Sequence, residues 1–208
     1  MSEDYDRSVF INCPFSPDYA DFLHVYMFTA LYCNVRPRCT REYDNAADDR
    51  IDNIVKLIQE CRYSIHDLSF VELDEQSNFP RLNMPFELGL FMGAIRFGGE
   101  HHKTKSFVML DNVEHDSKKA LSDLAGKDPK FHERNLQKAV TAVRDWLATE
   151  VRADLLHSGK LIYEAYNRFV FDLPALALRF RQDADNLIYI DRLSLMNSWL
   201  AENVQPPK

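Results

Sequence analysis

The feature of this sequence that most constrains its fold is a regular alternation of short apolar runs with longer segments of helical spacing. Three short apolar runs, each followed by polar or turn-forming residues, lie at residues 8–11, 63–68 and 106–110, and residues 35–38 form a weaker candidate strand between the first two. In the intervening segments the apolar residues recur every three or four positions, which is typical of amphipathic helices. Strands that alternate with helices form parallel sheets with right-handed crossovers. We therefore predict an α/β fold with an open parallel sheet of four or five strands flanked by helices.

The pattern changes in the last third of the chain. No further strand is evident after Asp111, and residues 131–151 have the spacing of a long helix. We predict an α/β domain over residues 1–150 and a helical extension over residues 151–208. The extension carries many large apolar side chains, and each stabilises the fold by roughly 1.5–3 kcal/mol when it is fully buried. Either the core or a second copy of the chain should cover them, so a homo-oligomer is an alternative to packing on the core.

Composition excludes several classes of protein. The 208 residues are 46% hydrophobic and carry a net charge of −7, which argues against binding to bulk nucleic acid or to an anionic membrane. The first residues lack a basic segment followed by an apolar stretch, and no window reaches the ~18 apolar residues of a membrane span, so we expect a cytoplasmic protein. The four cysteines have no zinc-ligand spacing, and we interpret them as reduced packing residues rather than a metal site.

Two acidic residues stand where predicted strands end and predicted helices begin. Asp67 follows the apolar run that starts at Tyr63, and Glu87 lies near the start of a predicted helix over residues 86–97. In open α/β sheets ligands bind at the carboxyl edge of the strands, so we expect both carboxylates to share one cleft there. Each acid also has a simpler interpretation, because acids are favoured in the first turn of a helix and in turns.

The residues around these acids resemble a known group of proteins. Residues 9–15, Asp67 and the helical segment of residues 83–94 together resemble the nucleoside 2-deoxyribosyltransferases and the bacterial TIR-like domains. The resemblance implies a flavodoxin-like sheet. In the transferases a Glu-x-Gly helix start carries the nucleophilic glutamate, which Glu87 and Gly89 match here, while Asp67 matches their aspartate. In TIR domains that cleave NAD the catalytic glutamate also lies on the helix after the third strand. The resemblance thus implies catalytic roles for Glu87 and Asp67.

Glycosidic chemistry needs residues of these types. Cleavage of an N-glycosidic bond passes through an oxocarbenium-like centre that a carboxylate can stabilise or trap, while another polar group holds the ribose hydroxyls. Glu87 suits the first role, because its position on an apolar helix should raise its pKa by desolvation.

Four further residues are candidates for substrate binding. Asn12 and Phe15 belong to the turn after the first strand, where the ring of Phe15 could stack on a base or a nicotinamide. Arg38, like Arg41, follows the second strand and could meet phosphates. Asn83 lies one helical turn before Glu87 and could direct its amide at the same point. The alternatives are a core phenylalanine, solvated arginines and a capping asparagine.

Two classes of function remain open from the sequence. The first is a nucleotide N-glycosidase that cleaves the nicotinamide–ribose bond of NAD or a related nucleotide, in the manner of a TIR-like defence effector or a deoxyribosyltransferase-like glycosidase. The second is a non-catalytic module that senses a nucleotide or holds a protein partner in the same cleft. The chain has six glycines and neither a Gly-x-Gly-x-x-Gly nor a Walker sequence, which disfavours hydride transfer and ATP hydrolysis. We expect no bound cofactor, since NAD enters this scheme as the substrate.

Overall fold

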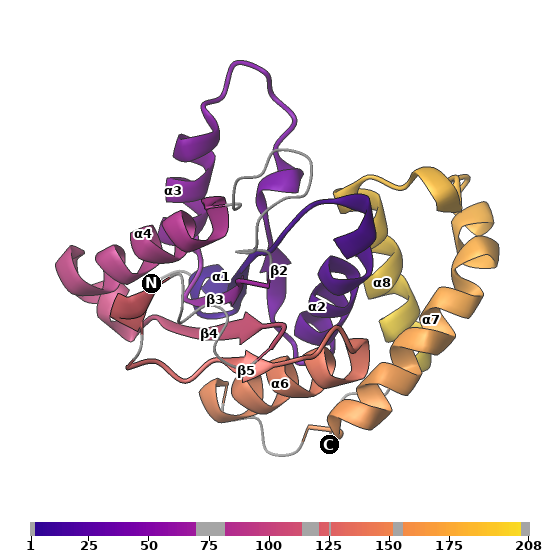
Figure 1. Ribbon diagram of the computed structural model, residues 1–208. Coiled ribbons are helices and arrows are strands. Elements are labelled where there is room, and N and C mark those ends of the chain that lie inside the picture. Colours follow the sequence, from indigo (N-terminus) through magenta and orange to yellow (C-terminus); the bar gives the residue numbers. More distant parts are fainter. Residues whose placement is uncertain (1–2, 70–81, 114–120, 125, 152–155, 205–208) are drawn as a thin grey trace.

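The computed structural model describes residues 3–69, 82–113, 121–124, 126–151 and 156–204 and confirms the α/β architecture. A five-stranded sheet with the order β2-β1-β3-β4-β5 lies at its centre, and all neighbouring strands are parallel (Figure 1). This is the strand order of flavodoxin-like sheets. The strands are β1 (Ser8–Asn12), β2 (Arg36–Arg38), β3 (Tyr63–Asp67), β4 (Ser106–Asp111) and β5 (Lys130–Phe131).

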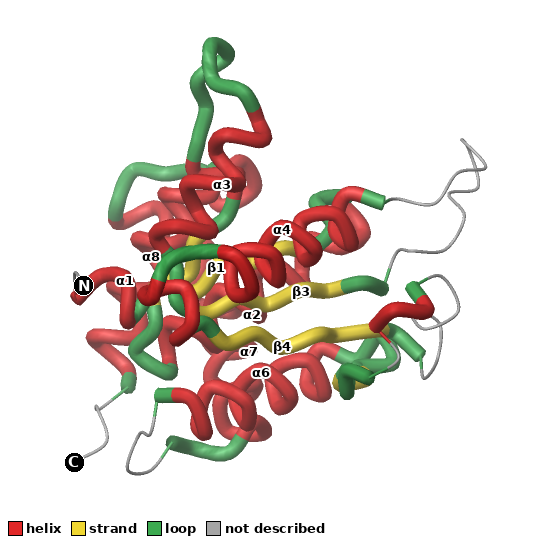
Figure 2. The backbone as a smooth tube through the Cα atoms, turned by 90° about the vertical axis from the view of Figure 1, so that its left-hand side faces the viewer, coloured by secondary structure: helices red, strands yellow, loops and turns green. Residues whose placement is uncertain are grey.

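Helices cover both faces of the sheet, which is why every residue of β1 and β3 is buried, including the polar Ser64, His66 and Asp67 of β3. Figure 2 shows α4 on one side of β3 and β4, and α6 on the other. The α-helices are α1 (Glu3–Asp6), α2 (Ala20–Tyr32), α3 (Arg50–Glu60), α4 (Asn83–Phe97), α6 (Leu136–Glu150), α7 (Gly159–Arg179) and α8 (Tyr189–Asn203). Shorter 3-10 helices are η1 (Pro17–Tyr19), η2 (Thr40–Glu42), η3 (Glu100–Thr104), η4 (Ser122–Leu124) and η5 (Ala184–Asn186).

Alternate residues of the central strands enter different hydrophobic clusters. Ile11 and Ile65 face the large cluster formed with α2, α6 and the C-terminal helices, whereas Phe10 faces a smaller cluster with α3 and α4. The same alternation assigns the side chains near the carboxyl edge: Asp67 shares the face of Ile65, and His66 shares the opposite face. The two faces of β3 therefore carry two different polar groups to the edge of the sheet.

Two predicted boundaries differ from the structure. Residues 130–131 form the fifth strand, so the helix predicted from residue 131 begins only at Leu136, where the Asn135 side chain accepts a hydrogen bond from the Lys138 amide. Helix α4 begins at Asn83, three residues before the predicted start, because Pro85 is tolerated in the first turn, where its missing N–H has no helical partner. Glu87 consequently lies in the second turn of α4.

The C-terminal helices pack on the α/β core. Phe28 of α2 lies with its ring centroid 5.7 Å from that of Phe169 on α7 and 5.9 Å from that of Trp199 on α8. All three side chains are buried in the large cluster, and Figure 1 shows α7 and α8 on the α2 side of the molecule. The four cysteines are free and buried, as predicted for packing residues. No helix in the described part of the chain is both long enough and apolar enough to cross a membrane.

Candidate functional site

The candidate site lies at the carboxyl edge of the sheet, next to β1 and β3. From β1 the chain adds β2 on one side of the sheet, and it then adds β3, β4 and β5 on the other side. In doubly wound sheets this switch point is where ligands bind. Here β1 ends at Asn12 and turns through Phe15, β3 ends at Asp67, and the segment after β2 leads to the start of α3 at Arg50. Residues from several parts of the chain therefore converge at this edge.

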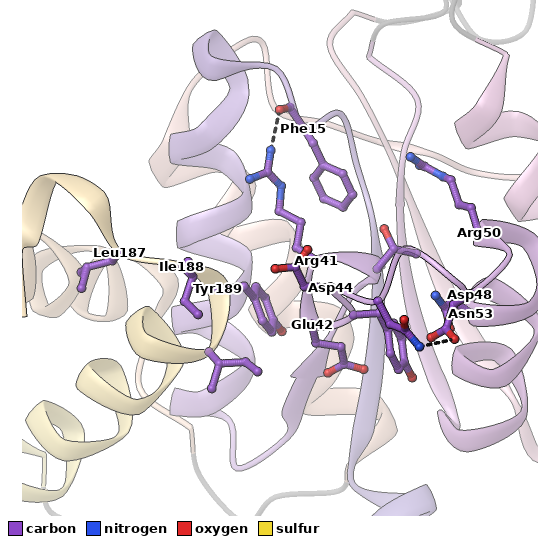
Figure 3. A pocket seen from close by; sticks show the side chains of 14 residues that line it. Phe15, Arg41, Glu42, Asp44, Asp48, Arg50, Asn53, Leu187, Ile188 and Tyr189 are labelled. Carbon is purple, nitrogen blue, oxygen red and sulfur yellow. Dashed lines mark hydrogen bonds between the residues drawn. The ribbon is translucent and has the colours of Figure 1, made fainter.

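A pocket of about 580 Å³ opens beside this edge, and a volume of this size is typical of small-ligand sites. Three segments line it: Phe15 after β1, residues of the connection from β2 into α3, and residues 187–190 at the start of α8. Figure 3 shows Arg41 and Arg50 entering from different segments, with the ring of Phe15 between them in this view. The pocket thus combines an aromatic face with two guanidinium groups.

Phe15, a predicted substrate-binding residue, lies on the wall of this pocket. Its side chain is half-buried, and the Arg41 guanidinium carbon stands 5.0 Å from the ring centroid. Arg41 also donates a hydrogen bond of 2.9 Å from Nη2 to the Phe15 carbonyl. These contacts fix both side chains relative to each other and leave an aromatic group available to a ligand ring.

Arg38 was also predicted to bind a phosphate, but its guanidinium pairs with carboxylates of the protein and does not line the pocket. Its Nε donates to both carboxylate oxygens of Glu42 at 2.7 and 2.8 Å, and its Nη2 lies 3.0 Å from Glu60. Although burial opposes the charge, these carboxylates raise the pKa of Arg38. The structure therefore places Arg38 in a network that stabilises the segment after β2, and it is Arg41 and Arg50 that reach the pocket.

Glu87 is a buried carboxylate next to the pocket. Its side chain is 6% exposed, and Arg50 Nη2 lies 3.6 Å from Glu87 Oε1, longer than an N–H···O hydrogen bond. Burial raises the pKa of Glu87 to about 7, although the positive charge of Arg50 opposes this shift. Arg50 is 60% exposed and lines the pocket, so it joins the buried carboxylate to the open space. Near neutral pH Glu87 is divided between its protonated and ionised forms.

Asn12 holds the start of α4 in place. Its buried side-chain amide donates 2.9 Å hydrogen bonds to the Met84 carbonyl and to His66 Nδ1. His66 is neutral near pH 7, because burial lowers its pKa to about 3. The amide therefore connects the ends of β1 and β3 with the first turn of α4. Glu87 lies one turn further along this helix. Asn83 is exposed at the first position of the same helix, one turn before Glu87.

Asp67 is fully buried and lies in a dense hydrogen-bond network. The hydroxyls of Tyr19 and Tyr26 donate to its Oδ2, the latter at 2.5 Å, and Ser69 donates to its Oδ1 through the amide at 3.1 Å and the hydroxyl at 2.6 Å. His132 Nε2 stands 3.5 Å from Oδ2. Burial alone would raise the pKa of Asp67, but the hydrogen bonds from His132, Ser69 and Tyr19 lower it. Asp67 is thus held ionised.

The network around Asp67 is not the triad of a serine hydrolase. The Arg134 amide donates a 3.1 Å hydrogen bond to His132 Nδ1, so Nδ1 acts as an acceptor and the ring proton is assigned to Nε2. That nitrogen stands 2.8 Å from Ser69 Oγ, whose own hydrogen points to Asp67. The histidine therefore donates to the serine and cannot take its proton, which a general base must do.

The two predicted catalytic acids lie at the same edge but on opposite faces of the sheet, so the expectation that they share one cleft is wrong. Asp67 is enclosed by residues of α2 and by His132, whereas Glu87 faces Arg50 of α3. The Cys13 thiol is affected by both acids. Burial is the main cause that raises its pKa, and the charges of Asp67 and Glu87 raise it further. Because Asp67 has no exposed surface, a ligand in the pocket approaches the Arg50–Glu87 pair and not Asp67.

Sequence reasoning missed three parts of this site. Arg50 was not singled out, His132 lay in a segment predicted to be helical, and residues 187–190 lay in the extension. Among the described residues, no group of three or more His, Cys, Asp and Glu side chains is placed to hold a metal ion. Comparisons with protein-family models, with curated proteins and with solved structures gave no match.

Proposed function

We propose that this protein is a nucleotide N-glycosidase whose substrate is NAD or a closely related pyridinium nucleotide. The observation that carries the proposal is the Arg50–Glu87 pair, a 6% exposed carboxylate 3.6 Å from an arginine that lines a pocket of about 580 Å³. The resemblance of residues 9–15, Asp67 and residues 83–94 to TIR-like and deoxyribosyltransferase proteins favours the same chemistry, and with it a role as a defence effector.

A pyridinium leaving group suits a site in which Glu87 alone takes the catalytic role. When the nicotinamide–ribose bond breaks, the pyridinium nitrogen keeps the bonding electron pair, and nicotinamide leaves as a neutral pyridine, so no proton donor is needed. The ribose carbon becomes an oxocarbenium-like cation, which ionised Glu87 would stabilise electrostatically or trap covalently. Water then adds to the ribose carbon and loses its proton to Glu87. Asp67, which is fully buried, serves to position the turn after β3.

The pocket offers partners for the other parts of such a nucleotide. The ring of Phe15 is available for stacking against a planar base or nicotinamide, and Arg41 and Arg50 supply donors for the diphosphate. Asp44 and Asp48 also line the pocket, so it carries both signs of charge. A pyridinium nucleotide likewise carries a cationic ring and an anionic diphosphate, which matches this mixture better than a simple anion does.

The direct test is release of nicotinamide from NAD by the purified protein. We expect Glu87→Gln to reduce the rate at least about a hundredfold, because the amide keeps the shape of the side chain but removes its charge and basicity. Glu202→Gln, which changes an exposed glutamate on α8, is the matched control and should retain the wild-type rate. The assay is repeated at high protein concentration so that a requirement for self-association is met. Full activity of Glu87→Gln would move the chemistry elsewhere.

One observation favours a second candidate function. Glu87 itself does not line the pocket, and Arg50 stands between the carboxylate and the open space. A non-catalytic module that senses a nucleotide would use the same aromatic and cationic groups without exposing the acid. Nucleotide binding by the wild-type protein with no nicotinamide release at any protein concentration would select this alternative.

A further inference from the structure

Arg50 differs from the other arginines near the pocket in how loosely it is held. Arg38 is fixed by two glutamates, and Arg41 is fixed by the carbonyl and the ring of Phe15. Among the residues that the structure describes, Arg50 has one long contact, to Glu87, and 60% of its side chain is exposed to solvent. The guanidinium at the first residue of α3 can therefore turn into the pocket without breaking a close hydrogen bond.

We propose that Arg50 is exchanged between Glu87 and the phosphate of a bound nucleotide, so that the site selects phosphorylated ligands over nucleosides and frees Glu87 when it does. This inference rests on the proposed nucleotide pocket and deepens it. A phosphate offers the guanidinium two oxygens in a bidentate arrangement, whereas Glu87 Oε1 offers one at 3.6 Å. The exchange thus improves the contacts of Arg50 and removes the positive charge from beside Glu87.

The exchange has a consequence for protons. Burial raises the pKa of Glu87 to about 7 while Arg50 opposes that rise, so removal of Arg50 must raise it further. Within the described residues, Cys13 after β1 also lies close enough to Glu87 for the two charges to interact. His66 of β3 stays neutral, and the basic residues of η3 lie beyond the C-terminal end of α4. A ligand with phosphates but no cationic ring should therefore bind with uptake of a proton. With NAD, the pyridinium ring would replace the lost positive charge and keep Glu87 ionised.

ADP-ribose is the appropriate probe, because its diphosphate does not titrate near neutral pH and it lacks the cationic ring. We would measure its binding by calorimetry at pH 7.5 in two buffers of different ionisation enthalpy, with adenosine as the uncharged ligand. The wild type should take up several tenths of a proton for each ADP-ribose bound. Glu87→Gln should take up none and should bind at least as tightly as the wild type, because it no longer competes for Arg50.

Arg50→Ala should weaken ADP-ribose binding by about tenfold or more, as expected for loss of a charged hydrogen-bond donor, and should leave adenosine binding unchanged. Arg179→Ala is the matched control: Arg179 is 59% exposed and pairs with Glu202 at 2.9 Å, on the C-terminal helices. It should bind ADP-ribose like the wild type. Thermal unfolding of each variant would verify that its fold is retained.

Four results would overturn the inference: no binding of ADP-ribose by the wild type, unaltered affinity of Arg50→Ala, an equal loss for adenosine, or proton uptake that persists in Glu87→Gln. Failure of the proposed function looks different. Binding that depends on Arg50 and takes up a proton, without cleavage of NAD, would refute the glycosidase and leave the exchange intact. Cleavage of NAD with none of these binding effects would do the reverse.

Discussion

At the scale of single residues, two carboxyl groups at one edge of the sheet have opposite electrostatics. Asp67 is surrounded by donors from Tyr19, Ser69 and His132, which lower its pKa in spite of full burial. Glu87 has burial without comparable donors, and its pKa rises to about 7. Environments that separate the pKa values of neighbouring acids are typical of active sites, where one group reacts while the other stays ionised. The structure thus distinguishes a structural acid from a chemically poised one.

The raised pKa of Glu87 makes a prediction about stability. A carboxyl whose pKa is 4.5 in the unfolded chain and about 7 in the folded protein contributes stability that is fully present below pH 4.5 and is lost as pH rises through 7. Glu87→Gln removes this dependence, so relative to the wild type it should gain up to about 3 kcal/mol between pH 4.5 and pH 8. Urea unfolding across this pH range measures the difference.

The control for this measurement is Glu202→Gln. Glu202 is paired with Arg179, and this contact lowers the pKa of Glu202. Its carboxyl is therefore largely ionised above about pH 5 in both the folded and the unfolded protein. Its difference from the wild type should therefore stay level between pH 6 and pH 8. A level difference for Glu87→Gln as well would show that the Glu87 carboxyl is not perturbed in solution.

Sequence reasoning found Glu87 and Asp67 because each follows a clear strand or helix signal. It could not find Arg50 as the partner of Glu87, because the two are 37 positions apart and meet only when α3 packs beside α4. His132 was missed for a similar reason: its role depends on the backbone of Arg134 and the hydroxyl of Ser69, which fix the ring through tertiary contacts. Long-range polar partners have no periodic signal in a single sequence.

At the scale of elements, the strands with the strongest apolar runs were predicted correctly. β1, β3 and β4 are each five or six residues long and largely buried. Burial on both faces leaves continuous apolar runs at residues 9–11 and 107–110, whereas β3 was recognised from Tyr63 and Ile65 ahead of its terminal Asp67. β5 has only two residues, Lys130 exposed and Phe131 half-buried, and contains no such run. A strand at the edge that pairs on one side needs fewer apolar residues, which is why the fifth strand could not be recognised.

Replacing a helical glycine by alanine should change the stability of the protein in opposite directions at Gly89 and Gly159. A Cβ added at Gly89 in α4 would meet no atom within 4 Å, whereas one added at Gly159 would lie 2.6 Å from Thr141 Cα in α6. Gly89→Ala should stabilise the protein by about 0.5–1 kcal/mol, because alanine restricts the unfolded chain and favours a helix. Gly159→Ala should destabilise it by roughly 1–3 kcal/mol, because backbone must move where α7 begins against α6. Midpoints of urea unfolding compare the two.

This pair also tests an interpretation of the sequence. The spacing of Gly89 and Gly93 is typical of a helix that lies close to a neighbour, but the structure leaves space at both positions, and the close helix approach is at Gly159. Destabilisation by Gly89→Ala would mean that α4 packs more closely in solution. Tolerance of Gly159→Ala would mean that the contact between α6 and α7 is looser than the structure indicates.

At the scale of the whole molecule, the C-terminal helices share the main hydrophobic cluster and also reach the pocket. Phe169 and Trp199 pack on Phe28 of α2, and the Tyr189 hydroxyl donates a 2.8 Å hydrogen bond to the Pro37 carbonyl in β2. Tyr189 itself lines the pocket. The pocket wall formed at the start of α8 therefore depends on the same packing that attaches the helices to the core.

This arrangement predicts that the α/β part and the C-terminal helices unfold together. Phe169→Ala should lower the free energy of unfolding by about 3–5 kcal/mol, because it leaves a cavity where α7 meets α2. Phe171, two residues along α7, is 86% exposed, so Phe171→Ala should change the free energy by less than about 0.5 kcal/mol. Native-state hydrogen exchange at the amides of β1 and β3 is the informative measurement, since α7 packs chiefly on α2, α6 and α8 and the strands report on the sheet.

In a single cooperative unit, Phe169→Ala reduces the protection of the sheet amides by the same free energy as it reduces the protection of α7. Sheet amides that keep their wild-type protection while α7 loses its own would show that the C-terminal helices form a separate folding unit. The pocket would then be assembled across two units, because Phe15 follows β1 while Ile188 precedes α8. In that case local opening of the C-terminal helices would open the pocket without unfolding the sheet, and the affinity for ADP-ribose would fall in Phe169→Ala while the sheet stays protected.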